Sequence, residues 1–173
     1  MVLPPVSLSF MKFQSIGNDF IIADLHRYQL AQANVLLEKL SLPETVRYLC
    51  NRRTGIGADC LLIITKSYDN NKADIVVYNA DGSYARNCLN GVRTIAHYLH
   101  AYCSFDAEMT VGVGGGLKFF CTVVRVYPEK KSADVITQIS GCKIIRPASV
   151  IVENKSLIQG CRISSALFLY ESK

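Results

Sequence analysis

Residues 91–102 constrain the fold more than any other stretch, because their apolar side chains have the spacing of a buried helix. Val92, Ile95, Ala96 and Leu99 recur at intervals of three and four residues, which places them on one face of an α-helix. One helix cannot cover such a face by itself, so the rest of the chain has to provide a layer that does. We therefore predict a deeply buried central helix here.

Apolar segments bounded by turn residues predict that the covering layer is a β-sheet. Turns are expected at Gly55-Ile56-Gly57, at residues 79–83 and at Gly114-Gly115-Gly116. The expected fold class is α+β, with a mixed, largely antiparallel sheet wrapped around the central apolar helix. The expected strands are residues 11–13, 20–23, 61–65, 73–78, 109–113, 117–126 and 133–139.

A second, shorter helix is expected to begin after Ser41, which would act as its N-cap ahead of Pro43. Residues 25–40 mix polar and apolar side chains without a clear period, so they predict no element. The residues expected on the buried face of the short helix are Val46, Leu49 and Cys50.

The domain organisation expected from these patterns has three segments. Residues 1–10 are apolar, contain Pro4-Pro5 and are predicted to be an N-terminal extension. Residues 11–140 are predicted to form the folded domain. Residues 141–173 are predicted to be a tail, to which we assign no function.

Composition limits the classes of partner. The net charge of +5 comes from 19 basic and 14 acidic residues, and the basic doublets Arg52-Arg53 and Lys130-Lys131 do not make the cationic tract typical of nucleic-acid binding. No apolar run is long enough to span a bilayer. The cysteines number seven, which is odd, and none forms a Cys-x-x-Cys pair or follows a secretory signal. We expect a cytoplasmic protein with reduced thiols and no metal, membrane or nucleic-acid partner.

Cys88 is the residue most suggestive of chemistry, because it lies just before the predicted central helix. Free N–H groups at a helix start favour a thiolate over a thiol, and they can also hold a carboxylate. One place could therefore supply both a base and an anion site. Position alone does not distinguish this role from that of a small buried cysteine, which is the commonest fate of a free cysteine.

Four segments together resemble the diaminopimelate epimerase family. They are Gly17-Asn18-Asp19-Phe20, Gly55-Ile56-Gly57-Ala58-Asp59, Asn79-Ala80-Asp81-Gly82-Ser83 and Cys88-Leu89-Asn90-Gly91. The segments occur in the family's order and at about its spacing, over residues 11–126. The resemblance implies that residues 11–140 form one half, the N-terminal half, of the pseudo-symmetric epimerase fold.

The resemblance also implies a function. The family interconverts the LL and meso forms of diaminopimelate, in lysine biosynthesis, without pyridoxal phosphate or a metal. Two cysteines act as base and acid on opposite faces of the substrate α-carbon, and Cys88 matches one of them. Asn18 and Asn79 would hydrogen-bond the substrate, and the backbone around Leu89 and Asn90 would bind its α-carboxylate.

Three departures from the family leave alternatives open. Leu89 stands where the family usually has glycine, and a Cβ there could crowd the anion or forbid a positive φ. Cys60 stands where the family often has glutamine, and we transfer no binding role to it. The motifs of the second half are not found, and Cys121, Cys142 and Cys161 lack the setting of the second catalytic cysteine.

These departures give several hypotheses. The first is an epimerase that is truncated and inactive alone, or that pairs with a second copy across an uncovered apolar face. The second is a non-catalytic binding or interaction protein that retains the half-fold. A third is a proline-racemase-like or phenazine-type isomerase. Among other polar residues, Asp59 and Asp81 are expected to organise their turns, and His97 and His100 to be structural.

Overall fold

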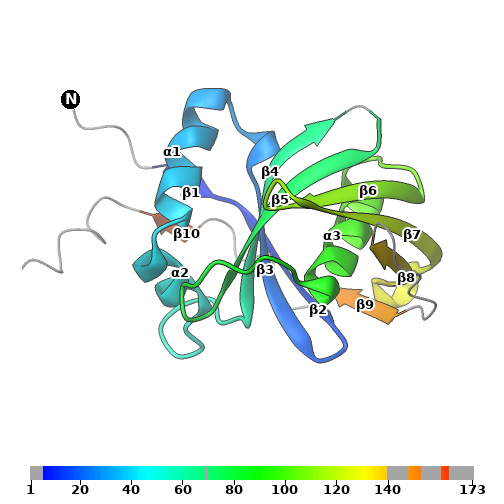
Figure 1. The fold of residues 1–173 in the computed structure, drawn as a ribbon. Helices are drawn as coiled ribbons and strands as arrows, with labels where there is room; N and C mark the ends of the chain where they lie inside the picture. Colours follow the sequence, from blue (N-terminus) through cyan, green and yellow to red (C-terminus); the bar gives the residue numbers. More distant parts are fainter. Residues whose placement is uncertain (1–5, 69, 140–147, 153–160, 164–173) are drawn as a thin grey trace, which may run out of the picture.

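The computed structural model describes residues 6–68, 70–139, 148–152 and 161–163. Within these ranges eight strands form a closed barrel, and α3 (Leu89–Tyr102) lies inside it (Figure 1). The barrel strands are β2 (Phe10–Ser15), β3 (Asn18–Asp24), β4 (Cys60–Tyr68), β5 (Lys72–Asn79), β6 (Glu108–Val113), β7 (Leu117–Tyr127), β8 (Ser132–Ile139) and β9 (Ala148–Val152).

The sheet is mixed and largely antiparallel, as predicted. The pairs β3–β4 and β5–β6 are parallel, and the remaining neighbours around the barrel are antiparallel. The β2–β3 hairpin turns at Ile16 and Gly17, which have φ of 52° and 86°. Gly114 and Gly115 also have positive φ, 59° and 75°, in the β6–β7 turn. The glycine-rich segment is therefore a hairpin turn, as the sequence predicts.

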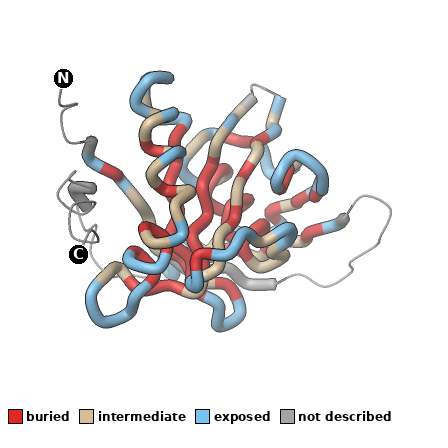
Figure 2. The backbone as a smooth tube through the Cα atoms, turned by 60° about the vertical axis from the view of Figure 1, so that its left-hand side comes forward, coloured by how far each residue is buried: buried red, intermediate tan, exposed pale blue. Residues whose placement is uncertain are grey.

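The prediction of a buried central helix is confirmed. Val92, Ile95 and Ala96 have no exposed surface, and Leu99 is 1% exposed. They pack against inward-facing residues of the barrel strands, in a cluster that includes Phe13, Leu62, Val77, Val111 and Phe119. Figure 2 shows the same division along the backbone, with buried strands inside and exposed loops at the ends. The hydrophobic effect of covering this helix is the main force that closes the barrel.

Two more helices cover the outer face of β3 and β4 (Figure 1). These are α1 (Leu30–Leu40) and α2 (Pro43–Cys50), preceded by the 3-10 turn η1 (Leu25–Arg27). Strands buried on both faces are apolar at successive positions rather than at alternate ones, and this explains the apolar runs in β3 and β4. The outer cluster includes Ile21, Ala23, Leu36, Leu40, Val46, Leu49, Cys50, Leu61 and Ile63.

The structure adds one helix that the sequence did not predict and contradicts one prediction in this region. Residues 30–40 form α1 although their pattern shows no clear period. Only Leu36 and Leu40 of this helix are fully buried, so its apolar face is too narrow to give a helical pattern. Ser41 is not an N-cap. Its backbone N–H and its hydroxyl both donate to Leu37 O, at 3.0 and 2.7 Å, so it ends α1. Leu42 precedes α2 and makes no side-chain cap.

Three described strands lie outside the predicted domain of residues 11–140. Strand β1 (Val6–Leu8) pairs with β10 (Cys161–Ile163), and Leu8 is fully buried in the outer cluster. Strand β9 pairs with β2 and β8 and completes the barrel. Within the predicted domain, the 3-10 turn η2 (Pro128–Lys130) joins β7 to β8. The boundaries at residues 10 and 140 stay predictions. In the described ranges, no helix has the length and apolar character needed to cross a membrane.

Candidate functional site

The topology brings the predicted site residues to one end of the barrel. Asn18 is the first residue of β3, and Cys60 is the first residue of the parallel strand β4. Asn79 is the last residue of the antiparallel strand β5 and is the direct partner of Cys60. The first turn of α3, with Cys88 just before it, enters the barrel at this end. Residues far apart in the sequence are therefore neighbours here.

Cys88 is the N-cap residue of α3. Its carbonyl accepts the first intrahelical hydrogen bond, from the Val92 N–H at 2.8 Å, and its side chain makes no cap hydrogen bond. The N–H groups of Leu89 and Asn90 precede that first bond, so the helix itself offers them no acceptor. The start of α3 thus presents N–H groups beside a thiol, as the sequence predicts.

Cys60 and Cys88 are hydrogen-bonded to each other through their thiols. This bond and the backbone N–H of Gly91 nearby lower the pKa of Cys88 to about 7, against the opposing effect of burial. The same bond, together with burial, raises the pKa of Cys60 far above its ordinary value. The charge therefore belongs on Cys88, because the helix N-terminus stabilises an anion there.

The other described thiols lack this environment. Burial raises the pKa of Cys50 to about 11 and that of Cys121 to about 12. Burial also raises the pKa of Cys103, which is the C-cap residue at the far end of α3. Cys88 is thus the described cysteine with the greatest thiolate character. The side chains of Cys142 and Cys161 lie outside the described residues.

Asn90 joins two elements of the site. Its Nδ2 donates to Asn18 Oδ1 at 3.1 Å, which links α3 to the β2–β3 turn. Its Oδ1 accepts from Arg93 Nη1 at 3.0 Å, and Arg93 is only 6% exposed. The cation of Arg93 therefore fixes which way the Asn90 amide faces, and Asn90 in turn orients Asn18.

Asn79 is held by the turn that follows it. Its N–H donates to Ser83 O at 2.9 Å and its Nδ2 donates to Ser83 Oγ at 3.0 Å. Asp81 Oδ1 accepts from the Ser83 N–H at 2.8 Å, so the predicted role of Asp81 in its turn is confirmed. Asn79 Oδ1 accepts from the Cys60 thiol at 3.7 Å. Asn79 therefore contacts Cys60, which interacts with Cys88.

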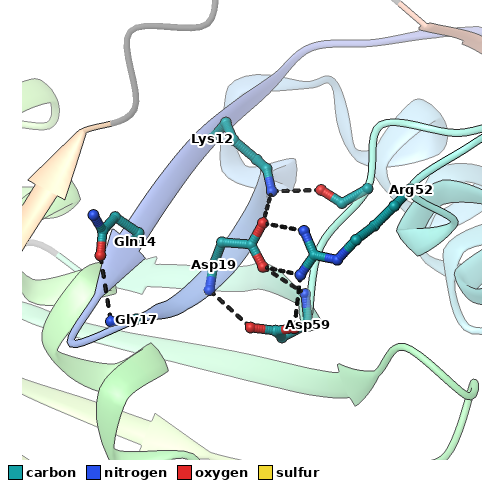
Figure 3. Close-up of polar contacts among 7 residues, drawn as sticks. Lys12, Gln14, Gly17, Asp19, Arg52 and Asp59 are labelled. Carbon is teal, nitrogen blue, oxygen red and sulfur yellow. Dashed lines mark hydrogen bonds and ion pairs between the residues drawn. The ribbon is translucent and has the colours of Figure 1, made fainter.

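A charged cluster beside the site ties the first two motifs together (Figure 3). Asp19 accepts from both terminal nitrogens of Arg52, at 2.8 and 2.7 Å, and also from Lys12. Lys12 also donates to the carbonyl of Gly57. Asp59 accepts from Arg52 at 2.8 Å and from the Asp19 N–H at 3.1 Å. The carboxylate of Asp59 therefore bonds to Asp19 and Arg52, and its expected role in organising its own turn stays a prediction.

The cluster stabilises the ionised form of Asp19. Burial raises the pKa of this carboxyl, but the hydrogen bonds from Arg52 and Lys12 outweigh burial and leave the pKa well below its usual range. The cluster holds the β2–β3 hairpin, with Asn18 at its turn, against the loop that leads to Cys60. Its role is therefore to position the site rather than to supply a reactive group.

Leu89 does not strain the helix start. It is the first residue of α3, and the described non-glycine residues with positive φ are Ile16, Asn71, Ser104 and Lys131. The expected difficulty that a Cβ would meet at a positive φ therefore does not arise. Leu89 is half-buried and packs against the core cluster.

The structure thus brings together Asn18 with Asn90, and Asn79 with Cys60 and Cys88. Sequence reasoning missed the part played by Cys60, by the Lys12–Asp19–Arg52 cluster and by Arg93. The signal for Cys60 was its place directly after the second motif, at the start of a buried strand. Among the described residues, no group of three or more His, Cys, Asp or Glu side chains is arranged to hold a metal.

Comparison with known proteins finds similarity to one family. The family model described as diaminopimelate epimerase matches residues 10–128. A diaminopimelate epimerase of Synechococcus sp. (strain JA-3-3Ab) is 38% identical over 133 residues, which are 77% of this chain and 42% of the relative. That of Campylobacter lari is 33% identical over 156 residues, or 89% of this chain and 53% of the relative. The chain spans about half the length of these two curated relatives.

A solved structure supports the fold alone. The crystal structure of methylitaconate-delta-isomerase superposes with a TM-score of 0.51 at 12% sequence identity. The match covers 69% of this chain and 35% of that chain. The expected half of a pseudo-symmetric fold is consistent with both kinds of comparison.

Proposed function

This chain belongs to the diaminopimelate epimerase family, and from that premise we propose that it supplies one catalytic face of a cofactor-independent amino-acid epimerase. The observation that carries the proposal is the setting of Cys88, a thiol of lowered pKa at the N-terminus of a buried helix. The proposed substrate is diaminopimelate, whose LL and meso forms differ in configuration at one α-carbon.

Cys88, as thiolate, would be the base that removes the α-proton. Its pKa of about 7 leaves a large fraction of the thiol ionised near neutral pH. The α-proton of an amino acid is weakly acidic, so the carbanion left behind requires strong electrostatic stabilisation. The N–H groups at the start of α3 would stabilise that charge and hold the α-carboxylate.

The remaining predicted residues would orient the substrate. The backbone of Leu89 and Asn90 would bind the α-carboxylate, and the amides of Asn18 and Asn79 would hydrogen-bond the rest of the molecule. Support comes from the bond between Asn90 and Asn18 at 3.1 Å and from that between Cys60 and Asn79 at 3.7 Å, at the same end of the barrel as Cys88. Orientation of this kind contributes on the order of 7–11 kcal/mol to lowering a barrier.

Inversion also requires an acid on the opposite face of the substrate α-carbon. We propose that a second copy of this chain supplies this acid by pairing with the first copy. Support comes from exposed apolar side chains along β7, where Phe120 is 49% exposed and Val124 is 56% exposed. The hairpin before β7 reaches the segment that leads to Cys88, since a Cβ on Gly114 would collide with the Tyr84 hydroxyl. A two-fold pair is the commonest way to cover such a surface.

The test follows hydrogen exchange and inversion separately. The chain is incubated with LL-diaminopimelate in heavy water, proton NMR reads loss of the α-hydrogen, and chiral chromatography reads conversion to the meso form. We expect exchange that Cys88→Ala abolishes and Cys103→Ala leaves unchanged, because Cys103 caps the other end of the same helix. Exchange that survives Cys88→Ala would show that this thiol is not the base.

The second hypothesis is a non-catalytic binding protein that retains the half-fold. One observation favours it: the amides of Asn79 and Asn90 already bond to groups of this chain. Under this hypothesis diaminopimelate raises the melting temperature, but the wild-type chain shows neither exchange nor inversion.

A further inference from the structure

Cys60 and Cys88 form a pair of thiols where the first turn of α3 packs against β4. The side chain of Cys60 belongs to the same core cluster as that of Leu62, two residues along β4, and Cys88 packs against this cluster. A Cβ on Gly91 would lie 3.0 Å from both Cys88 Sγ and Leu62 Cδ2. Glycine at this position therefore allows the helix start to approach the strand closely, which brings the two thiols into hydrogen-bond contact.

We propose that Cys60 and Cys88 are the two halves of a reversible intramolecular disulfide, which forms when the protein meets a hydroperoxide. Cys88 is half-buried, so a small oxidant reaches it from the open end of the barrel. Cys60 is only 7% exposed and is reached mainly through Cys88. The two thiols therefore have different roles, one as the site of attack and the other as the resolving partner.

The reaction balances with the peroxide as its only oxidant. The Cys88 thiolate attacks one peroxide oxygen and breaks the O–O bond, which leaves a sulfenic acid on Cys88 and releases the other oxygen as hydroxide or alkoxide. The Cys60 sulfur then attacks the Cys88 sulfur, forms the S–S bond and breaks the S–O bond. The thiol proton of Cys60 leaves with the hydroxyl group as water. The protein loses two electrons and the peroxide gains them.

The other described cysteines are not placed to compete. Cys50 packs in the outer cluster, on the opposite side of β4 from Cys88. Cys121 is buried within β7, and Cys103 ends α3 beside Asp24 and Arg27. The pairing is therefore selective for Cys60 and Cys88.

Disulfide formation would switch off the proposed base. This consequence rests on the proposed function, because it assumes that Cys88 removes the α-proton. The oxidation itself does not depend on catalysis, since it uses only the two thiols and the peroxide. Reduction by a small dithiol would restore the thiolate.

The experiment treats the reduced, full-length chain at low concentration with a small excess of hydrogen peroxide. Free thiols are then blocked with N-ethylmaleimide, and the chain is digested without reductant for mass spectrometry. We expect a cross-linked pair of peptides, one with Cys60 and one with Cys88, that lacks two hydrogens and disappears on reduction. The count of free thiols should fall by two per chain.

Variants test the order of events. Cys60→Ser should leave Cys88 as a sulfenic acid that dimedone traps and that further peroxide converts to the sulfinic acid. Cys88→Ser should leave Cys60 reduced at the same dose, and Cys103→Ser should give the wild-type disulfide. Wild-type chain in which Cys88 becomes sulfinic acid while Cys60 stays reduced would overturn the inference. Cys88 joined to any other cysteine, or to a second chain, would overturn it equally.

The result separates this inference from the proposed function. A Cys60–Cys88 disulfide in a chain without hydrogen exchange supports the inference and counts against the catalytic proposal. Exchange activity that peroxide leaves unchanged, with no cross-linked peptide, supports the catalytic proposal and overturns the inference.

Discussion

Arg52 donates hydrogen bonds from both terminal nitrogens to the carboxylate of Asp19, at 2.8 and 2.7 Å, although the two residues are 33 positions apart in the sequence. Asp19 follows the substrate-site candidate Asn18, and Arg52 lies in the loop that leads to Cys60. A bidentate contact between an arginine and a carboxylate fixes the relative orientation of the two side chains as well as their distance. The pair therefore sets how the β2–β3 turn lies against the start of β4.

The first prediction concerns this pair. Arg52→Ala should lower the free energy of unfolding by about 1–2 kcal/mol, because it removes charge-assisted hydrogen bonds that are partly open to solvent. Arg53→Ala is the matched control, since Arg53 is the exposed neighbour, and it should change stability by less than about 0.5 kcal/mol. Urea titration followed by circular dichroism measures both. Equal effects of the two variants would mean that the contact adds nothing specific.

The second prediction concerns the central helix. Leu99→Ala should cost about 2–5 kcal/mol, since it leaves a cavity in the barrel. Leu30→Ala is the control, because Leu30 is 77% exposed at the start of α1 and should cost less than about 1 kcal/mol. Denaturant titration compares the two. A small effect at Leu99 would contradict the packing of α3.

How far the sequence predicts this structure depends on how local each signal is. The central helix was predictable because Val92, Ile95 and Leu99 repeat at helical spacing. Strands β3 and β4 were predictable as apolar runs bounded by turns. Helix α1 was missed because its buried face is narrow, with Leu36 and Leu40 alone fully buried. Ser41 was misassigned because a serine between two helices fits either end.

Prediction of the candidate site from the sequence also depended on whether the signal was local. Cys88, Asn18, Asn79 and Asn90 stand in recognisable motifs, so their grouping followed from the family resemblance. The contact between Cys60 and Cys88 was not predictable, because it depends on how closely α3 approaches β4. Gly91 belongs to the fourth motif, but the motif does not tell which residues of β4 this glycine approaches.

The third prediction concerns acid. Burial lowers the pKa of His97 to about 4, from an ordinary value of 6.5, so the folded state favours the neutral ring. The unfolded chain then binds a proton more readily, and stability should fall as pH drops from about 6.5 toward 4. The loss between pH 7 and pH 5 should be on the order of 2 kcal/mol.

Urea titrations at the two pH values test this prediction, with His97→Gln as the variant that removes the titrating group. The difference between pH 7 and pH 5 should shrink in His97→Gln, whatever its absolute stability. His26→Gln is the control, because His26 is exposed in η1, and it should keep the wild-type difference. An unchanged difference in His97→Gln would assign the acid sensitivity to other groups.

The fourth prediction concerns assembly through β7. Sedimentation equilibrium should show a monomer–dimer equilibrium for the wild-type chain, because Phe120 and Val124 expose apolar surface there. The double variant Phe120→Lys with Val124→Lys should shift it to monomer, through charge repulsion across the two-fold pair. Leu30→Lys is the control, because Leu30 is also an exposed apolar residue but lies at the start of α1 rather than on β7. A wild-type chain that stays monomeric at the highest concentration reached would rule out the proposed pair.

The last prediction concerns the reactivity of Cys88. Only the thiolate is alkylated, so the rate of labelling should rise with pH through the pKa of about 7 rather than near the ordinary value of 9.0. Cys60→Ala removes the hydrogen bond that contributes most to this lowering, and the midpoint should move up toward the ordinary value. Cys103→Ser should leave it unchanged. Iodoacetamide labelling at several pH values, read on the Cys88 peptide by mass spectrometry, gives each midpoint. A midpoint that stays near 7 in Cys60→Ala would assign the activation to the N-terminus of α3 alone.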